Sequence, residues 1–442
     1  MKSNRALAGQ LFSMTWPMLF GILSLMSFQL VDSAFIGQLG VLPLAAQGFT
    51  APIQLLFIGL QVGLGIATTA LISQALGAGK AQFAKQLGGL VIILGAVGIF
   101  AFSVFVWWGR SGLLAMLSAP ESVTPIIDEY WGWWLFSTWL GAMNYFMYSI
   151  CRSHGNTLLP GIMMVVTSLL NIGLDPLFIF VFDLGIVGAA IATIVSFGIG
   201  LSVMSPKVFK NHWISFDFGD ISLRKTLAKI GHIMGPAMMS QLLPPISSVL
   251  ATKLLAGFGT AAVAAWAVSS RFEFFAIVTV LSLTMTLPPM VGRLFGAGNV
   301  VEIRQLIRIA VMYVLLFQAL VALLVWCFAE GIAGLMSSDV QVTEIVTWHL
   351  LWVPISLGPL GVCMIMVSVA NALGQSYRAL WISALRLFAF FLPGLWIGGE
   401  LGGLSGLFIG AAIANVMAGV TAWQMYQRLL KSACNHAAQA TS

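Results

Sequence analysis

The chain has 442 residues, of which 59% are hydrophobic and only 8% are charged, and its formal net charge is +6. A soluble domain carries about 25% charged residues, so this composition excludes a soluble globular protein and indicates a polytopic membrane protein. The basic residues are scattered over short loops, which argues against a nucleic-acid partner. The Cys and His residues show no metal-ligand spacing, and we expect no cofactor.

Apolar runs separated by polar or Gly/Pro breaks predict twelve transmembrane helices in an all-α fold. The expected spans lie near 12–37, 48–75, 87–108, 124–149, 158–182, 185–205, 232–256, 266–291, 306–328, 343–369, 377–399 and 402–426. An even number of spans places both termini on the same side of the membrane. Lys and Arg gather in the segments on that side, Lys2 among them, so the positive-inside rule makes both termini cytoplasmic.

The opposite, outer side is predicted to be poor in cations and rich in tryptophan. Arg110 is the one basic residue in an expected outer loop. The third and fourth spans meet this surface at Trp107, Trp108, Trp131, Trp133 and Trp134. Such clustering is typical of an aromatic belt, and we expect all five rings to lie at the interface.

An internal repeat with an offset of 219 residues relates the two halves of the chain. Pro17 matches Pro236, and the same offset relates three pairs of glycine positions: Gly40 and Gly259, the Gly-Ala-Gly turns at 77–79 and 296–298, and Gly155 and Gly374. Since each half holds an even number of spans, the halves are expected to be parallel repeats. We expect an N-lobe at 1–205, a cytoplasmic linker at 206–231 and a C-lobe at 232–442.

Two acids lie deep within the spans of the first half. Asp175 follows Asn171 by four residues, so the two side chains share a helix face, and Pro176 leaves the carbonyl of Ile172 without its helical donor. Asp32 lies in the first span. The repeat pairs both acids with uncharged residues, which makes them special to the N-lobe. A carboxylate inside a span costs at least ~2.5 kcal/mol and is a functional-site hypothesis by default.

Depth along the spans predicts that these acids meet. Asp32, Asn171, Asp175 and Thr193 all lie on the order of 10 Å below the outer surface, at ~1.5 Å per residue. Two carboxyl groups that lie close together in surroundings of low polarity cannot both ionise without a large cost in free energy, and a bound cation or proton relieves that cost. The four residues are therefore predicted to bind H⁺, Na⁺ or a cationic substrate. The alternative is polar adhesion between helices, although such contacts usually employ Ser, Thr or Asn.

Other polar or helix-breaking residues have two possible roles. Pro17 is either a hinge in the first span or a static kink. Four side chains are candidates for the substrate cavity or for simple packing: Gln29, Asn144, Tyr145 and Tyr148. In the second half, Glu273 is expected to form a structural ion pair with Lys253 or Arg271.

At this point the chain resembles the multidrug and toxic compound extrusion (MATE) transporters, most closely their DinF-like prokaryotic subgroup. The resemblance rests on the two six-span halves, Pro17, Gln29-Leu-Val-Asp32, the repeated Gly-Ala-Gly turns, and Asn171-x-x-x-Asp175 with Thr193. It implies a monomeric antiporter of the bacterial inner membrane that exports cationic or amphipathic drugs as H⁺ or Na⁺ enters. It also implies a coupling site at Asp32, Asn171, Asp175 and Thr193, and a bend at Pro17.

Three other functions match parts of this pattern. A flippase for a lipid-linked precursor shares the repeat plan but favours a basic cavity for a pyrophosphate. An intramembrane aspartyl protease also needs two acids, yet its Tyr-Asp and Gly-x-Gly-Asp signatures are absent, because Asp32 follows Val31 and Asp175 follows Leu174. A channel needs neither a hinge nor a titrating pair. We therefore expect a transporter rather than an enzyme, with membrane lipid as its other partner.

Overall fold

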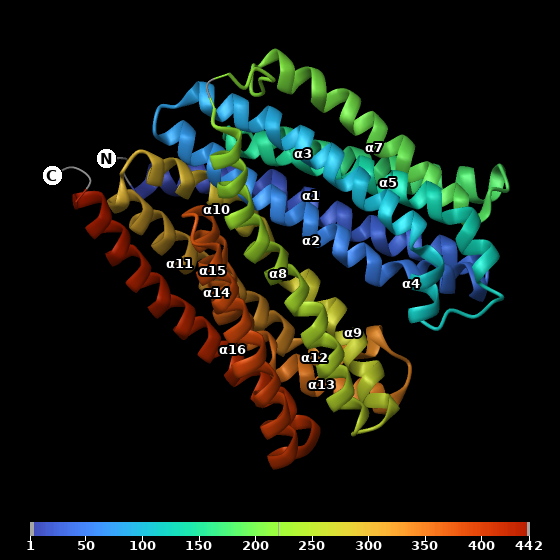
Figure 1. The fold of residues 1–442 in the computed structure, drawn as a ribbon. Helices are drawn as coiled ribbons and strands as arrows, with labels where there is room; N and C mark the ends of the chain where they lie inside the picture. Colours follow the sequence, from blue (N-terminus) through green and yellow to red (C-terminus); the bar gives the residue numbers. More distant parts are fainter. Residues whose placement is uncertain (1–3, 220, 440–442) are drawn as a thin grey trace. The chain divides into compact units, whose positions relative to one another are not determined.

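The computed structural model describes residues 4–219 and 221–439, so Lys2 lies outside the described residues. Figure 1 shows helices joined by short turns, and the described part of the chain contains no strand. The first elements are α1 (Asn4–Gln38), α2 (Val41–Gly77), α3 (Ala81–Trp108), α4 (Arg110–Met116), α5 (Thr124–Ser153), α6 (Leu158–Pro176), the π-helical turn η1 (Leu177–Val181) and α7 (Gly185–Lys210).

The helices of the second half are more often interrupted than those of the first. They are α8 (Leu223–Ala256), α9 (Thr260–Ala276), α10 (Val278–Gly296), α11 (Val300–Cys327), α12 (Ala329–Met336), α13 (Val340–Trp352), the 3-10 turn η2 (Pro354–Ser356), α14 (Leu357–Ala372), α15 (Ser376–Ala384), the π-helical η3 (Leu385–Phe391) and α16 (Leu392–Gln439). Local sequence sets some of the ends. Asp339 begins α13 because its Oδ1 accepts hydrogen bonds from the backbone N–H groups of Gln341 and Val342 at 2.9 and 3.1 Å.

The helices account for all twelve expected spans. Nine segments of the described chain are long and apolar enough to cross a membrane. One of them, Ser376–Arg428, holds two spans because Gly402 and Gly403 have non-helical backbone angles inside α16. The helices α5 and α8 supply the remaining two, with 30 and 34 residues. These spans confirm the prediction of an all-α polytopic fold.

The repeat is also visible in the backbone. Three pairs of glycines 219 residues apart have nearly the same positive φ: 113° and 107° at Gly40 and Gly259, 73° and 71° at Gly79 and Gly298, and 84° and 75° at Gly155 and Gly374. Residues with a Cβ rarely adopt these angles, so both halves place glycine at the same turns. The matched turns confirm the repeat that the sequence predicted.

The chain divides into two compact units. One unit spans Met14–Met238, from most of α1 to the first half of α8. The other contains the helices after Met239, together with the first turns of α1. The predicted division into an N-lobe at 1–205, a cytoplasmic linker at 206–231 and a C-lobe at 232–442 stays a prediction.

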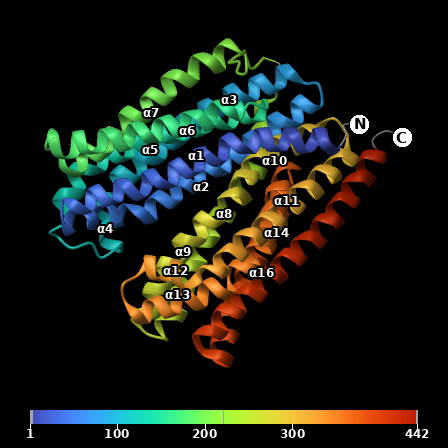
Figure 2. The same ribbon diagram turned by 180° about the vertical axis from the view of Figure 1, so that it is seen from behind.

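The Met14–Met238 unit is organised around α5, which packs against α2, α3 and α7 (Figure 2). Among the tryptophans expected at the interface, Trp107, Trp108 and Trp133 are exposed, whereas Trp131 and Trp134 are buried. The expected belt is therefore wrong for these two residues. They face the interior because Trp131 and Trp134 lie three apart on one side of α5, with their rings 5.5 Å apart.

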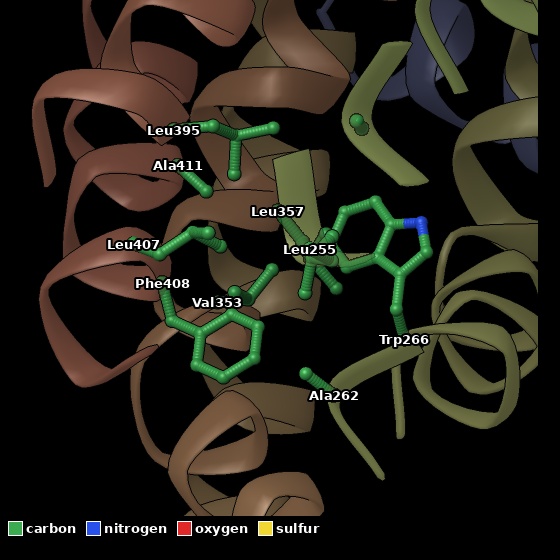
Figure 3. Packing of buried hydrophobic residues seen from close by; sticks show 10 residues of the cluster. Leu255, Ala262, Trp266, Val353, Leu357, Leu395, Leu407, Phe408 and Ala411 are labelled. Carbon is green, nitrogen blue, oxygen red and sulfur yellow. The ribbon is translucent and has the colours of Figure 1, made fainter. Parts of the chain in front are cut away.

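The second unit has a hydrophobic core where four helices meet. Figure 3 shows Trp266 of α9, Leu357 of α14, and Leu395 and Phe408 of α16 around Leu255 of α8. The two halves of α16 approach backbone to backbone, because a Cβ on Gly398 would collide with the carbonyl of Gly406.

The prediction that Glu273 pairs with Lys253 or Arg271 is wrong, because its partner is a histidine. Glu273 Oε1 lies 2.6 Å from Nε2 of His349, a fully buried side chain on α13. Arg271 precedes Glu273 by two positions, so it points away from that face of α9 and is exposed, as is Lys253. The contact of α9 with α13 decides the pairing, and no local spacing in the sequence reports it.

Candidate functional site

A cavity of about 770 Å³ lies inside the Met14–Met238 unit, between α1, α2, α5, α6 and α7. Its lining includes Asp32 and Thr193 from the predicted coupling site. All four predicted cavity residues line it as well: Gln29, Asn144, Tyr145 and Tyr148. The described cavity wall has one acid, Asp32, and contains no Lys or Arg. A cavity of this size and character can enclose a drug-sized molecule.

Asp32 extends from α1 into this cavity and is half-buried. Its Oδ2 accepts a hydrogen bond of 3.1 Å from Nε2 of Gln47 on α2. A single amide donor leaves most of the lone pairs of the carboxylate unused, since an ionised carboxylate has about four acceptor sites. Asp32 therefore retains the capacity to bind a proton or a cation from the cavity.

Asp175, Asn171 and Thr193 form one hydrogen-bonded network that joins α6 to α7. The Asn171 amide donates from its nitrogen to Oδ2 and Oδ1 of Asp175 at 2.8 and 3.2 Å, and its oxygen accepts from Oγ1 and the backbone N–H of Thr193 at 3.0 and 3.2 Å. We assign this amide orientation because it gives both amide atoms a complementary partner. Asp175 is fully buried, and Asn171 is 2% exposed.

The four predicted coupling residues thus fall into two groups. Asn171, Asp175 and Thr193 are joined directly, whereas Asp32 bonds to Gln47. Thr193 connects the groups in space because its side chain belongs to the network and also lines the cavity that contains Asp32. Asp175 lies behind the wall and does not line it. The side-chain oxygens of all four residues could coordinate one sodium ion only if the hydrogen bonds within the two groups were rearranged.

Pro176 ends the regular part of α6 immediately after Asp175. The next five residues form η1, in which the backbone N–H of Phe182 donates to the carbonyl of Leu177 at 3.0 Å. A π-helical turn of this kind often marks a functional site. Gly188 of α7 allows close packing here, since a Cβ at that position would lie 2.6 Å from the backbone carbonyl carbon of Phe178.

The proposed cavity residues differ in what they do structurally. Asn144 donates from its amide to the carbonyls of Phe197 at 2.8 Å and Leu140 at 3.1 Å, so it fixes α5 to α7 at the cavity wall. Tyr145 packs so closely on Gly65 of α2 that no Cβ fits between them. These contacts give Asn144 and Tyr145 a packing role in addition to their exposure to the cavity.

Sequence reasoning missed a row of glutamines on α2. Gln47, Gln54 and Gln61 line the cavity at intervals of seven residues, which places them on one helix face. Gln47 bonds to Asp32, and Gln54 Oε1 accepts from the hydroxyl of Thr138 at 3.3 Å. Their seven-residue spacing within an apolar helix was the signal that could have revealed them.

Pro17 lies inside α1, which continues through it as one helix. Its carbonyl faces Gly161 of α6, where a Cβ would lie 2.5 Å from the Pro17 oxygen. One turn later, a Cβ on Gly21 would lie 2.9 Å from the sulfur of Met164. The hinge role of Pro17 stays a prediction, but its position is fixed by a close contact between α1 and α6.

Comparison with known proteins agrees with this architecture. The family model described as MatE matches residues 17–177 and 236–397, two segments that begin 219 residues apart and together cover more than half of the chain. The FAD transporter of Shewanella oneidensis is 30% identical over 427 residues, which cover 95% of this chain and 94% of that protein. The multidrug export protein MepA of Staphylococcus saprophyticus is 25% identical over 420 residues, with coverage of 92% and 90%.

A solved structure is more similar still. The Vibrio cholerae MATE transporter VcmN in the bent form is 63% identical, with a TM-score of 0.96, and the match covers 98% of this chain and 99% of VcmN. The family resemblance predicted from the sequence is therefore confirmed, while the DinF-like subgroup stays a prediction. The chain belongs to the MATE family of membrane transporters.

Proposed function

We propose that this transporter exports cationic or amphipathic drugs and that H⁺ or Na⁺ entering the cell drives the export. The observation that carries the proposal is the cavity of about 770 Å³ with Asp32 as the one acid in its described lining. A carboxylate in a mostly apolar enclosure attracts a cation strongly because water screens it poorly. The same carboxylate can hold a drug cation, a sodium ion or a proton, but each one weakens binding of the others.

The wall of the cavity suits flat, positively charged molecules. Tyr130, Trp134, Tyr145 and Tyr148 contribute aromatic surface, and aromatic faces attract cations. The glutamines of α2 add neutral hydrogen-bonding groups that do not repel a cation. The multidrug export relative named above supports drugs as the substrate.

The hydrogen-bonded network of Asp175, Asn171 and Thr193 connects the protonation state of Asp175 to the wall of the cavity. With Asp175 ionised, the Asn171 nitrogen donates to the carboxylate, and the Thr193 hydroxyl donates to the Asn171 oxygen. With Asp175 protonated, the amide can rotate so that its oxygen accepts from the acid. Its nitrogen then donates to Thr193 Oγ1 at 3.0 Å, and the hydroxyl donates to the carbonyl of Ala189 at 3.0 Å.

The two orientations of the amide thus suit two protonation states of Asp175, and the rotated one gives up the contact of the amide oxygen with the backbone N–H of Thr193. Thr193 reverses its role from donor to acceptor toward Asn171, and it does so at the cavity wall. We infer that this reversal changes how the wall binds its cargo. A bend of α1 at Pro17 would then alter the position of Asp32 and complete the release.

A competing substrate comes from the FAD transporter relative. FAD carries a negatively charged pyrophosphate, whereas the described lining contains Asp32 and no basic residue. The same argument applies to a lipid-linked pyrophosphate. Charge therefore favours a cationic drug over both anions.

The test is ethidium efflux from proteoliposomes under an imposed pH gradient or, separately, a sodium gradient. Asp32→Asn should abolish efflux, and Asp183→Asn is the matched control because Asp183 is exposed in the turn before α7. Wild-type efflux by Asp32→Asn would refute the role of Asp32. Counterflow of FAD in place of ethidium would refute the cationic substrate class.

A further inference from the structure

A second concave site lies between α3 and α5, which pack side by side (Figures 1 and 2). It is a groove of about 300 Å³ that shares no lining residue with the cavity of Asp32. On α3 it extends from Phe100 to Trp107, and on α5 from Gly132 to Trp139. Each helix contributes positions i, i+3, i+4 and i+7, so two parallel stripes form the walls. Seven residues of helix correspond to a length of about 10 Å.

The groove is mostly apolar, because among its described lining residues only Ser103, Trp107 and Trp139 carry polar side-chain atoms. The hydroxyl of Ser103 donates to the carbonyl of Ile99 at 2.8 Å, and the indole N–H of Trp139 donates to the carbonyl of Ala96 at 2.9 Å. Phe100 and Phe136 are 60% and 48% exposed. Because α3 is one of the membrane spans, this exposed surface lies at the depth of the hydrocarbon. Its chemistry suits an acyl chain.

A pair of opposite charges lies at the end of the groove. The guanidinium of Arg110 lies 5.0 Å from the ring centre of Trp107, which lines the groove. Arg110 Nε donates to Oδ1 of Asp128 at 2.8 Å, and the two side chains are 36% and 46% exposed. Gly132 leaves room for the Trp107 ring, since a Cβ at position 132 would lie 2.8 Å from the edge of that ring.

We propose that the groove and the charge pair bind one phosphatidylethanolamine molecule of the surrounding bilayer. The guanidinium has five N–H donors and employs one of them toward Asp128, so others can reach a phosphate. The ammonium of the ethanolamine group would donate to the Asp128 carboxylate, and one acyl chain would fill the groove below Trp107. A headgroup with both charges matches this site, whereas a purely anionic headgroup would meet the repulsion of Asp128.

Native mass spectrometry of the delipidated full chain in detergent tests the proposal. The probes are palmitoyl-oleoyl phosphatidylethanolamine and the phosphatidylglycerol and phosphatidylcholine with the same chains. The unmodified protein should retain one phosphatidylethanolamine more tightly than either other lipid. Arg110→Gln should weaken that binding about tenfold, as expected for the loss of a charged hydrogen bond. Asp128→Asn should remove the preference over phosphatidylglycerol.

A pair of matched variants tests the groove itself. Val104→Trp fills it, while Val97→Trp adds the same bulk at an exposed position of α3 that does not line it. We expect Val104→Trp to lose the tightly bound lipid and Val97→Trp to keep it, with both proteins eluting as the unmodified chain does on size exclusion. Equal binding by Arg110→Gln and the unmodified protein would overturn the proposal. Equal loss in both tryptophan variants, or equal retention of all three lipids, would overturn it as well.

Discussion

The contact of Pro17 with Gly161 makes a quantitative prediction about the packing of α1 on α6. A methyl group at 161 would lie 2.5 Å from the carbonyl oxygen of Pro17 and 2.8 Å from its Cβ. Real Cβ atoms do not approach other atoms so closely, and backbone cannot rotate away, so the two helices must separate. Overpacking of this kind costs about 1–3 kcal/mol. Gly161→Ala should therefore lower the thermal unfolding midpoint, followed by tryptophan fluorescence in detergent.

The same helix offers a matched control. Gly173 of α6 has no atom within 4 Å of its built Cβ, so Gly173→Ala adds a methyl group to open space. Removing a helical glycine usually stabilises by about 0.5–1 kcal/mol, and the control should therefore melt at or above the unmodified protein. The two alanine variants should differ in the sign of their effect. If Gly161→Ala and Gly173→Ala have the same thermal unfolding midpoint, α1 and α6 do not pack as closely as described.

Three further variants test the network, the hinge and the buried pair. Asp175→Asn removes the acid of the network with Asn171 and Thr193, so ethidium efflux should lose part of its pH dependence. Pro17→Ala should restore the backbone donor of α1, so a fluorescent cation should still bind at equilibrium while efflux per protein falls. His349→Ala should remove a fully buried side chain and the partner of half-buried Glu273, which should cost about 1–3 kcal/mol, measured as a lower thermal midpoint.

Each of these variants has an outcome that contradicts its reasoning. If Asp175→Asn shows the same pH dependence of efflux as the unmodified protein, Asp175 takes no part in the transport cycle. Normal turnover by Pro17→Ala would make the proline a static feature of α1. His349→Gln retains an amide that can bond to Glu273, so it should be milder than His349→Ala, and equal melting of the two would show that the contact contributes nothing.

Properties that depend on the local sequence could be predicted well. The twelve spans follow from hydropathy, and the repeat follows from glycines whose backbone angles other residues rarely adopt. The contact of Asn171 with Asp175 follows from their spacing of four on one helix. The approach of Thr193 required one more step, an estimate of depth along two antiparallel helices, and the structure brings its hydroxyl to 3.0 Å from the Asn171 amide.

Properties set by contacts between distant helices could not be predicted. Gln47 is adjacent to Asp32 because α2 packs against α1 at that height, and His349 meets Glu273 because α13 packs against α9. The burial of Trp131 has the same origin, since hydropathy cannot tell which face of α5 turns inward. The partners of Asp32 and Glu273 lie 15 and 76 positions away, so no local pattern connects them.

The two acids of the predicted coupling site, Asp32 and Asp175, are placed for different tasks, and this difference bears on how coupling can work. Asp32 contacts the cavity, where cargo and ions arrive, whereas Asp175 is fully buried and reaches the cavity only through Asn171 and Thr193. An acid without access to cargo cannot compete with it for binding directly. It can act by reversing the hydrogen bonds of its neighbours, and the Asn171 amide is suited to this because it can bond to Asp175 and to the Thr193 hydroxyl in either orientation. Coupling through Asp175 therefore requires an amide at position 171, so Asn171→Leu should uncouple transport even though Asp32 and the cavity wall around it are intact.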